Sequence, residues 1–188
     1  MPDSAEVWLV RHGETEWSRD GRHTSVTDLA LTPKGEEQAA VLHDRLSETS
    51  FDKVVCSPLG RALRTAELAG VEIDEVDPDL HEWRYGDYEG VTTPTIRETA
   101  PGWTVWSQPS PGGESGAEVA ARCDSVIARC RERAGRTLLV GHGHSLRVLA
   151  ARWLDEPFAF GRHLLLETAT VSVLGDDRGA PVILRWNV

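Results

Sequence analysis

The sequence predicts a single α/β domain over residues 1–188, a three-layer sandwich whose central sheet is mostly parallel and covered by helices on both faces. Three observations predict it. Short apolar runs alternate along the chain with longer helical segments, helix-capping signals begin several of those segments, and no repeat or linker divides the 188 residues. Strands that alternate with helices of this length form βαβ units, and the chain length fits one domain.

The first part of the chain is expected to form two short buried strands, each followed by a helix. Residues 6–10 are apolar and stop abruptly at a polar stretch, which predicts the first strand. A Thr-Pro pair opens a helix over 33–46, because Pro at the first helical position after a Thr cap is favoured. Residues 54–56 form the second strand, and a Ser-Pro pair at 57–58 repeats the capping signal for a helix through about Ala69.

The second part of the chain continues the alternation. Residues 71–76 alternate apolar and acidic side chains, as a half-exposed edge strand does. Residues 77–113 are rich in turns and aromatic side chains, with a short helix after Thr93-Pro94. The remaining elements are expected as a helix opened by a capping box over 115–133, a strand over 137–140, a helix over 145–154 and a closing hairpin of 171–174 with 182–186.

The net charge and the cysteine pattern argue against certain partners and against a disulfide or zinc framework. A formal net charge of −10 argues against nucleic acid or an anionic membrane as a partner, because phosphate-rich surfaces recruit an excess of Lys and Arg. Cys56, Cys123 and Cys130 are odd in number and lack C-x-x-C spacing, so neither a disulfide framework nor a zinc ribbon is expected. Cys123 and Cys130 share one helix face and are expected in the core.

The N-terminal sequence and the lengths of the apolar runs predict a cytoplasmic location. The first six residues lack the basic and apolar regions of a signal peptide. No apolar run approaches the roughly 20 residues that span a bilayer.

Polar side chains follow three of the predicted strands where each strand ends. Arg11 and His12 end the first strand, Ser57 and Arg61 follow the second, and a Gly-His-Gly-His sequence over 141–144 ends the fourth. Ligands of open α/β sheets bind beyond the carboxyl ends of the strands. The sequence therefore predicts a site that gathers arginines and histidines at one edge of the sheet.

Four motifs on these segments resemble one family. They are R-H-G-E-T-E-W at 11–17, S-P-L-G-R-A-L-R-T-A at 57–66, L-H-E-W-R-Y-G-D-Y-E-G at 80–90 and G-H-G-H-S-L-R at 141–147. In this order and spacing they resemble the histidine phosphatase superfamily in its phosphoglycerate-mutase-like branch, and most closely the small bacterial acid phosphatases of that branch. The resemblance covers residues 6–175 and implies a phosphoglycerate-mutase-like fold.

The resemblance implies five catalytic residues. It places the nucleophile at His12, which would accept a phosphoryl group and form a phosphohistidine. Arg11, Arg61 and His142 would hold the phosphoryl oxygens, a task suited to the planar fork of arginine. Glu82 matches the general acid that protonates the leaving group and later activates water.

A second set of residues is expected to contact the substrate. Ser18 takes the place of the Asn common in the family, while Thr24 and Ser25 stand where the family has Ser/Thr-Gly. Gly143 would contribute a backbone N–H at a helix N-terminus. His144 stands where the mutase branch usually has Asn, and it could line the pocket or form a hydrogen bond behind it.

Other residues have no motif support. His23, His43, His81 and His163 are expected to be surface or packing residues. Trp103 and Trp106 could form a lid over the site or cover one end of the core. His142 and His144 lack a third ligand at a plausible spacing, so neither a metal nor another cofactor is expected.

The preferred function is hydrolysis of small phosphate monoesters. A mutase would have to retain a bisphosphorylated intermediate with extra cationic side chains, yet residues 90–114 contain a single cation, Arg97. A phosphoglycerate mutase dependent on 2,3-bisphosphoglycerate and a non-catalytic sensor of phosphorylated ligands stay open as alternatives. The expected partner is a small phosphorylated metabolite, and a homodimer is compatible with the sequence.

Overall fold

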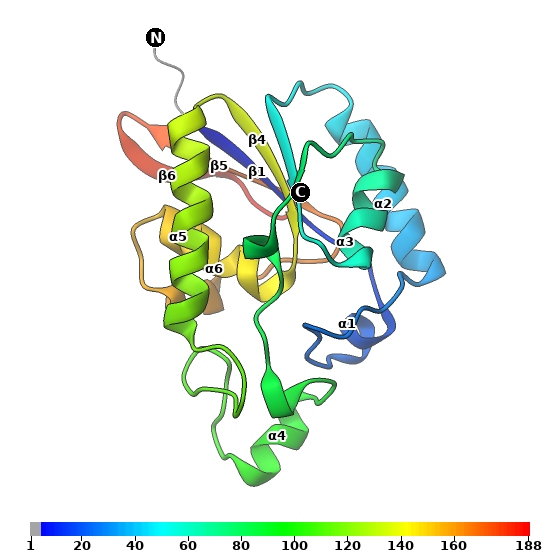
Figure 1. Cartoon of the computed structure of the whole chain (residues 1–188), viewed down its shortest axis with the longest axis vertical. Helices are drawn as coiled ribbons and strands as arrows, with labels where there is room; N and C mark the ends of the chain where they lie inside the picture. Colours follow the sequence, from blue (N-terminus) through cyan, green and yellow to red (C-terminus); the bar gives the residue numbers. More distant parts are fainter. Residues whose placement is uncertain (1–4) are drawn as a thin grey trace.

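A six-stranded sheet forms the centre of the protein in a computed structural model that describes residues 5–188 (Figure 1). Its strands lie in the order β3 (Glu75–Val76), β2 (Lys53–Cys56), β4 (Arg136–Gly141), β1 (Glu6–Arg11), β5 (Val171–Asp177) and β6 (Ala180–Arg185). Strands β3, β2, β4 and β1 are parallel to one another, whereas β5 is antiparallel to both of its neighbours, β1 and β6. The expected α/β class and mostly parallel sheet are confirmed.

Helices cover both faces of the sheet and complete three layers. Helices α2 and α3 lie on one side of the sheet in Figure 1, and α5 and α6 lie on the other. The helices are α1 (Glu16–Asp20), α2 (Pro33–Leu46), α3 (Gly60–Leu68), α4 (Thr93–Thr99), α5 (Gly116–Arg133) and α6 (Gly143–Trp153), with short 3₁₀ helices η1 (Pro78–Leu80), η2 (Gly86–Tyr88) and η3 (Phe158–His163).

Strand β1 shows how the sequence builds two cores. Successive side chains of a strand point to opposite faces of the sheet. Val7 and Leu9 accordingly join the apolar cluster beneath α5 and α6, while Trp8 and Val10 join the cluster beneath α2 and α3. Cys123 and Cys130 are buried in the cluster beneath α5 and α6, as expected, and Cys56 is buried in the other cluster.

Two helix starts agree with the capping signals. Thr32 caps α2 by accepting a hydrogen bond from the Gly35 backbone N–H, with Pro33 at the first helical position. Ser115 and Glu118 form the expected capping box of α5. Helix α6 begins at Gly143, two residues before the predicted start.

Two expectations are wrong. The edge strand predicted over 71–76 is only Glu75–Val76 in the structure. The Asp74 carboxylate accepts the Val54 N–H, so this backbone donor of β2 bonds to a side chain and not to the backbone of a neighbouring strand. Ser57 does not cap a helix: α3 begins at Gly60 after Leu59, which makes no side-chain capping bond. The Ser57 hydroxyl is instead hydrogen-bonded to His142.

Two further expectations concern a signal peptide and membrane-spanning segments. The expectation of no signal peptide falls partly on residues 1–4, which lie outside the described residues. Among residues 5–188, no helix combines the length and apolar character needed to cross a membrane.

Candidate active site

The candidate site lies at the carboxyl ends of the neighbouring parallel strands β1, β4 and β2. Arg11 ends β1 and His12 follows it, and the backbone N–H of His12 donates to the Gly141 carbonyl at the end of β4. The Ser57 N–H donates to the Val140 carbonyl in the same way from the end of β2. The sheet therefore brings together three segments that are far apart in the sequence.

The ring of His12 is held in one tautomer. Its Nδ1 lies 2.7 Å from the carbonyl oxygen of Gly13. A carbonyl oxygen only accepts hydrogen bonds, so Nδ1–H is the donor, and Nε2 of the neutral ring carries the free electron pair. A Cβ on Gly13 would lie 2.3 Å from the Gly35 carbonyl oxygen, so a glycine is required for this close backbone approach.

The surroundings of His12 keep the ring neutral. Burial lowers its pKa well below 6.5, and the positive charges of Arg11 and Arg61 lower it further. A neutral imidazole with a free Nε2 is a nucleophile at physiological pH, whereas an imidazolium is not.

A second buried histidine packs beside the first. The ring centroids of His12 and His142 are 5.2 Å apart, with the planes inclined by 58°. The Nε2 of His142 lies 2.7 Å from the hydroxyl oxygen of Ser57. Burial, followed by the charge of Arg61, lowers the pKa of His142 well below 6.5.

Two arginines are fixed by backbone carbonyls. Arg11 donates from Nη1 to the Leu166 carbonyl at 2.6 Å. Arg61 is fully buried and donates from Nη1 to the Thr27 carbonyl at 3.0 Å and from Nη2 to the Ser25 carbonyl at 3.1 Å. Burial lowers the pKa of both guanidinium groups, but from a value so high that they remain charged.

Three buried nitrogens in this cluster have no hydrogen-bond partner within residues 5–188. They are Nε of Arg11, Nε of Arg61 and Nδ1 of His142. A buried polar nitrogen without a hydrogen-bond partner costs about 1–3 kcal/mol, so a cluster of them points to a functional constraint. Two charged donors and an imidazole in one cluster match the acceptors of an oxyanion.

Glu82 lies at the N-terminus of α6. Its Oε1 accepts the backbone N–H groups of Trp83 and Ser145, each at 2.8 Å, and its Oε2 accepts the N–H of His144 at 2.9 Å. The bonds from His144 and Ser145 use first-turn N–H groups of α6 that have no partner within the helix. A Cβ built on Gly143 would lie 3.3 Å from Arg11 Nε and 3.6 Å from Glu82 Oε2, so the acid and the guanidinium flank this glycine.

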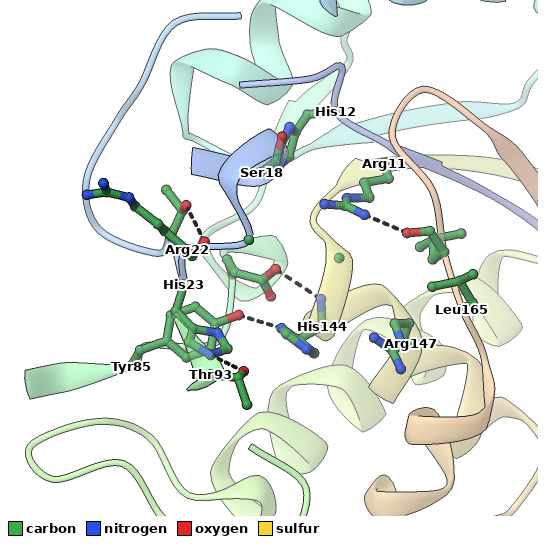
Figure 2. Close-up of a pocket in the computed structure, with 15 residues that line it drawn as sticks. Arg11, His12, Ser18, Arg22, His23, Tyr85, Thr93, His144, Arg147 and Leu165 are labelled. Atoms are coloured by element: carbon green, nitrogen blue, oxygen red, sulfur yellow. Dashed lines mark hydrogen bonds between the residues drawn. The ribbon is translucent and has the colours of Figure 1, made fainter. Parts of the chain in front are cut away.

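A cavity of about 290 Å³ opens over these groups (Figure 2). Arg11 and His12 lie toward one end, and Tyr85, Thr93 and His144 lie toward the other. The lining residues are Arg11, His12, Ser18, Gly21, Arg22, His23, Thr24, Glu82, Tyr85, Thr93, Gly143, His144, Arg147, Leu165 and Leu166.

Most of the predicted site residues line this cavity, but three do not. Arg61 and His142 are almost completely buried next to His12 and are not among the lining residues. Ser25 is also absent from the lining, because its hydroxyl donates to the Glu89 carboxylate. Ser18 lines the cavity, yet its hydroxyl already accepts the Thr15 N–H in the capping box of α1 and donates to the Thr15 carbonyl.

Sequence reasoning missed part of the wall opposite His12. His23 was expected at the surface or in packing, but it is buried and lines the cavity, with Nε2 3.1 Å from the Thr93 hydroxyl oxygen. The Tyr85 hydroxyl oxygen lies 2.6 Å from Nδ1 of His144, and both residues line the cavity, so His144 lines the cavity and is hydrogen-bonded to a neighbour in its wall. Tyr85 belongs to the E-W-R-Y motif, which was a signal for its role.

Trp103 and Trp106 lie behind this wall and not over the opening. Trp103 is buried against the His23 ring, with centroids 5.2 Å apart. Trp106 packs edge-on to His144 at the same centroid distance. Neither indole lines the cavity, so both support the rings that do.

Comparisons with known proteins agree on the family. The model of the histidine phosphatase superfamily (branch 1) matches residues 7–188. The chain is 45% identical over 175 residues to an acid phosphatase of Mycobacterium tuberculosis, covering 91% of this chain and 86% of that protein. It is 35% identical to a probable phosphoglycerate mutase of Salmonella choleraesuis, covering 89% and 83%.

A solved structure shows the same fold over nearly the whole length. The structure of an open reading frame from Mycobacterium tuberculosis superposes with a TM-score of 0.95 at 41% identity, covering 98% of this chain and 97% of that one. The family match and these identities agree with the order and spacing of the four sequence motifs. The chain belongs to the histidine phosphatase superfamily, branch 1.

Proposed function

We propose that the protein is a phosphatase that hydrolyses small phosphate monoesters through a phosphohistidine on His12, with Glu82 as general acid and base. The observation that carries this proposal is the bond from His12 Nδ1 to the Gly13 carbonyl. It leaves Nε2 as a neutral nucleophile within a cluster of donors suited to an oxyanion.

The first chemical step transfers the phosphoryl group to the enzyme. The electron pair of His12 Nε2 forms the N–P bond while the bond from phosphorus to the leaving oxygen breaks. Glu82, in its protonated form, gives its proton to that oxygen, so the product leaves as an alcohol. Glu82 and His12 both line the cavity, which supports a shared substrate.

The charge on the phosphoryl oxygens is balanced by fixed donors. Arg11, Arg61 and His142 contribute the buried nitrogens that have no partner among residues 5–188. Gly143 adds a backbone N–H at the start of α6. Donors that are already oriented stabilise the transition state without reorganising, and each contributes about 10²–10³ in rate.

The second step hydrolyses the phosphohistidine. Glu82 is now a carboxylate and takes a proton from water as the water oxygen attacks phosphorus. The N–P bond breaks and its electron pair returns to Nε2, while Nδ1–H keeps its bond to Gly13. The imidazole therefore never needs to gain or lose a proton, in keeping with its depressed pKa.

Hydrolysis is favoured over a mutase reaction by the placement of Arg97. A mutase must hold a bisphosphorylated intermediate while it turns over, which requires further cations near the site. Arg97 is the single cation of residues 90–114, and its Nε donates to the Trp103 carbonyl at 2.9 Å. It does not line the cavity. Arg22 and Arg147 are the arginines other than Arg11 that line the cavity, and residues 90–114 add none to them. We therefore propose water as the acceptor and a small phosphorylated metabolite as the substrate.

The cysteines support a reducing compartment as the place of action. All three are buried and unpaired, which fits the cytoplasm, where thiols stay reduced.

A phosphate-release screen tests the proposal. Wild type and His12→Ala are compared on sugar phosphates, phosphoglycerates, nucleotides and phosphoamino acids, with His163→Ala as a matched control at an exposed position. We expect release by wild type and by His163→Ala, and none by His12→Ala. With 3-phosphoglycerate, an isomer that forms only when 2,3-bisphosphoglycerate is added would establish a mutase instead. Binding without any turnover would establish a sensor.

A further inference from the structure

Glu82 lies in a segment that has no regular secondary structure of its own. The residue stands between η1, which ends at Leu80, and η2, which begins at Gly86. A carboxyl group that donates and removes protons must be held within a fraction of an ångström. The orientation of Glu82 therefore depends on how this connecting segment is anchored to the rest of the protein.

Arg122 of α5 anchors the segment on the N-terminal side of Glu82. Its Nη1 donates to the Asp79 carbonyl at 2.7 Å and to the His81 carbonyl at 2.9 Å. The His81 carbonyl directly precedes Glu82 in the chain. The Arg122 side chain is only 9% exposed, so these bonds are formed away from solvent.

Glu114 anchors the segment on the C-terminal side of Glu82 and is itself held by Arg122. Its Oε1 accepts from Arg122 Nε at 3.1 Å, and its Oε2 accepts the Arg84 N–H at 2.8 Å. The Glu114 backbone carbonyl accepts the indole N–H of Trp83 at 2.9 Å. The Trp83 backbone N–H in turn donates to Glu82 Oε1 at 2.8 Å.

The Arg122 guanidinium thus holds the chain on both sides of Glu82, directly on one side and through Glu114 on the other. From these bonds we propose that Arg122 and Glu114 are positioning residues for Glu82, a role that rests on the function proposed above. They touch neither the cavity nor the reacting atoms. Their task is to hold residues 79–84 so that the Glu82 carboxyl faces the leaving oxygen of a substrate bound at His12.

Arg129 provides a matched comparison on the same helix. It lies seven residues further along α5 and its Nη2 bonds to the side chains of Asp77 and Asp79, with 3.1 Å to Asp79 Oδ2. It contributes ion pairs to the start of the segment but no bond to the residues that flank Glu82. An Arg129 variant therefore loses an α5 arginine that pairs with the start of the segment but keeps the bonds that Arg122 and Glu114 make on both sides of Glu82.

Leaving-group dependence separates a positioning role from a general structural one. The value of kcat/KM reports on phosphoryl transfer to His12, the step in which Glu82 gives its proton. An alkyl phosphate such as glycerol 3-phosphate needs that proton, whereas p-nitrophenyl phosphate expels a stable anion without it. A displaced acid therefore slows the alkyl ester selectively.

The experiment measures kcat/KM on both esters for Arg122→Met, Arg122→Lys, Glu114→Gln and Arg129→Met. For Arg122→Met we expect a loss of about 10²-fold on the alkyl ester, the effect of misplacing a catalytic group by about an ångström, and a much smaller loss on the nitrophenyl ester. Arg122→Lys keeps the charge but not the fork and should lie between wild type and Arg122→Met. Arg129→Met should retain wild-type values on both esters.

A double-mutant cycle with Glu82→Gln completes the test. If Arg122 acts through Glu82, adding Arg122→Met to Glu82→Gln should cause almost no further loss on the alkyl ester. Additive losses, or equal losses on the two esters by a folded Arg122→Lys variant, would overturn the positioning role. Failure of the proposed function looks different, because no variant or wild type would then release phosphate in a His12-dependent manner.

Discussion

The hydroxyl oxygen of Ser57 lies 2.7 Å from Nε2 of His142, and both side chains are completely buried. Ser57 directly follows β2 and His142 directly follows β4, so this bond joins two neighbouring strand ends within the candidate site. It fixes the ring plane of His142 and determines where its other nitrogen, Nδ1, points.

Ser57→Ala tests that bond. The change leaves a buried ring nitrogen of His142 without a partner, which should lower the free energy of unfolding by about 1–3 kcal/mol. We expect kcat/KM to fall about tenfold, since each 1.36 kcal/mol of transition-state stabilisation is tenfold in rate. Thermal unfolding and steady-state kinetics on one phosphate monoester measure the two effects. Unchanged kinetics in a destabilised variant would restrict the Ser57 bond to a structural role.

Arg61→Lys tests the buried guanidinium. Lysine keeps the charge but loses the planar fork that reaches the carbonyls of Thr27 and Ser25 at once. We expect kcat/KM to fall by about 10²-fold, the usual effect of removing one oriented donor from an anionic transition state. Arg64→Lys is the matched control one turn along α3, because Arg64 pairs with Glu36 and Glu67 at the surface. Equal effects of the two changes would argue against a phosphate-holding role for Arg61.

The buried histidines predict how stability depends on pH. Burial lowers the pKa of His12, His142 and His144 well below 6.5, and that of His23 to about 4. Between these values and 6.5 the unfolded chain binds more protons than the folded protein, so the free energy of unfolding falls as the pH falls below 6.5. Each such histidine contributes up to about 1.4 kcal/mol per pH unit.

Chemical denaturation at pH 7.5, 6 and 5 measures this dependence. In His23→Gln the free energy of unfolding should fall less steeply with pH, because one of the buried histidines is removed. His163→Gln, at an exposed position, should show the same pH dependence as the wild type. A free energy of unfolding that stays constant from pH 7.5 to 5 would contradict the depressed pKa values.

Tyr85→Phe tests the wall opposite His12. Burial raises the pKa of Tyr85 well above 10, so its hydroxyl stays protonated and is hydrogen-bonded to Nδ1 of neutral His144. Removing the hydroxyl breaks this bond and lets the His144 ring rotate at the end of the cavity away from His12 (Figure 2). We expect KM to rise about three- to tenfold with kcat almost unchanged, the size of effect that one lost hydrogen bond produces. Tyr88→Phe is the control, because Tyr88 does not line the cavity. A fall in kcat at constant KM would assign Tyr85 to the chemical step instead.

Local signals were sufficient for much of the fold. The Thr32 cap and the capping box of Ser115 and Glu118 each act within three residues, so the sequence alone located the starts of α2 and α5. The edge strand over 71–76 failed for a reason that alternation does not encode. The side chain of Asp74 takes a donor of β2, and only two residues of the segment pair with it.

The site was predictable where it depends on the ends of strands. Arg11, His12 and His142 follow or end buried parallel strands, and the topology brings them together. Ser57 and His23 were missed as contributors because their partners are distant in the chain. Ser57 bonds to a residue 85 positions away and His23 to one 70 positions away. Neither contact lies within one element, because the first joins the ends of β2 and β4 and the second joins a loop to α4, so no local periodicity predicts them.

Trapping the phosphoryl group on His12 is the most direct test of the proposed mechanism. A rapid-quench reaction with a ³²P-labelled monoester, stopped in alkali, preserves a phosphohistidine, which acid then hydrolyses. We predict acid-labile label on the peptide that contains His12 in the wild type, its accumulation in Glu82→Gln when water attack is slowed, and no label in His12→Ala. Phosphate release that continues undiminished in His12→Ala, with no label on that peptide in the wild type, would contradict the account.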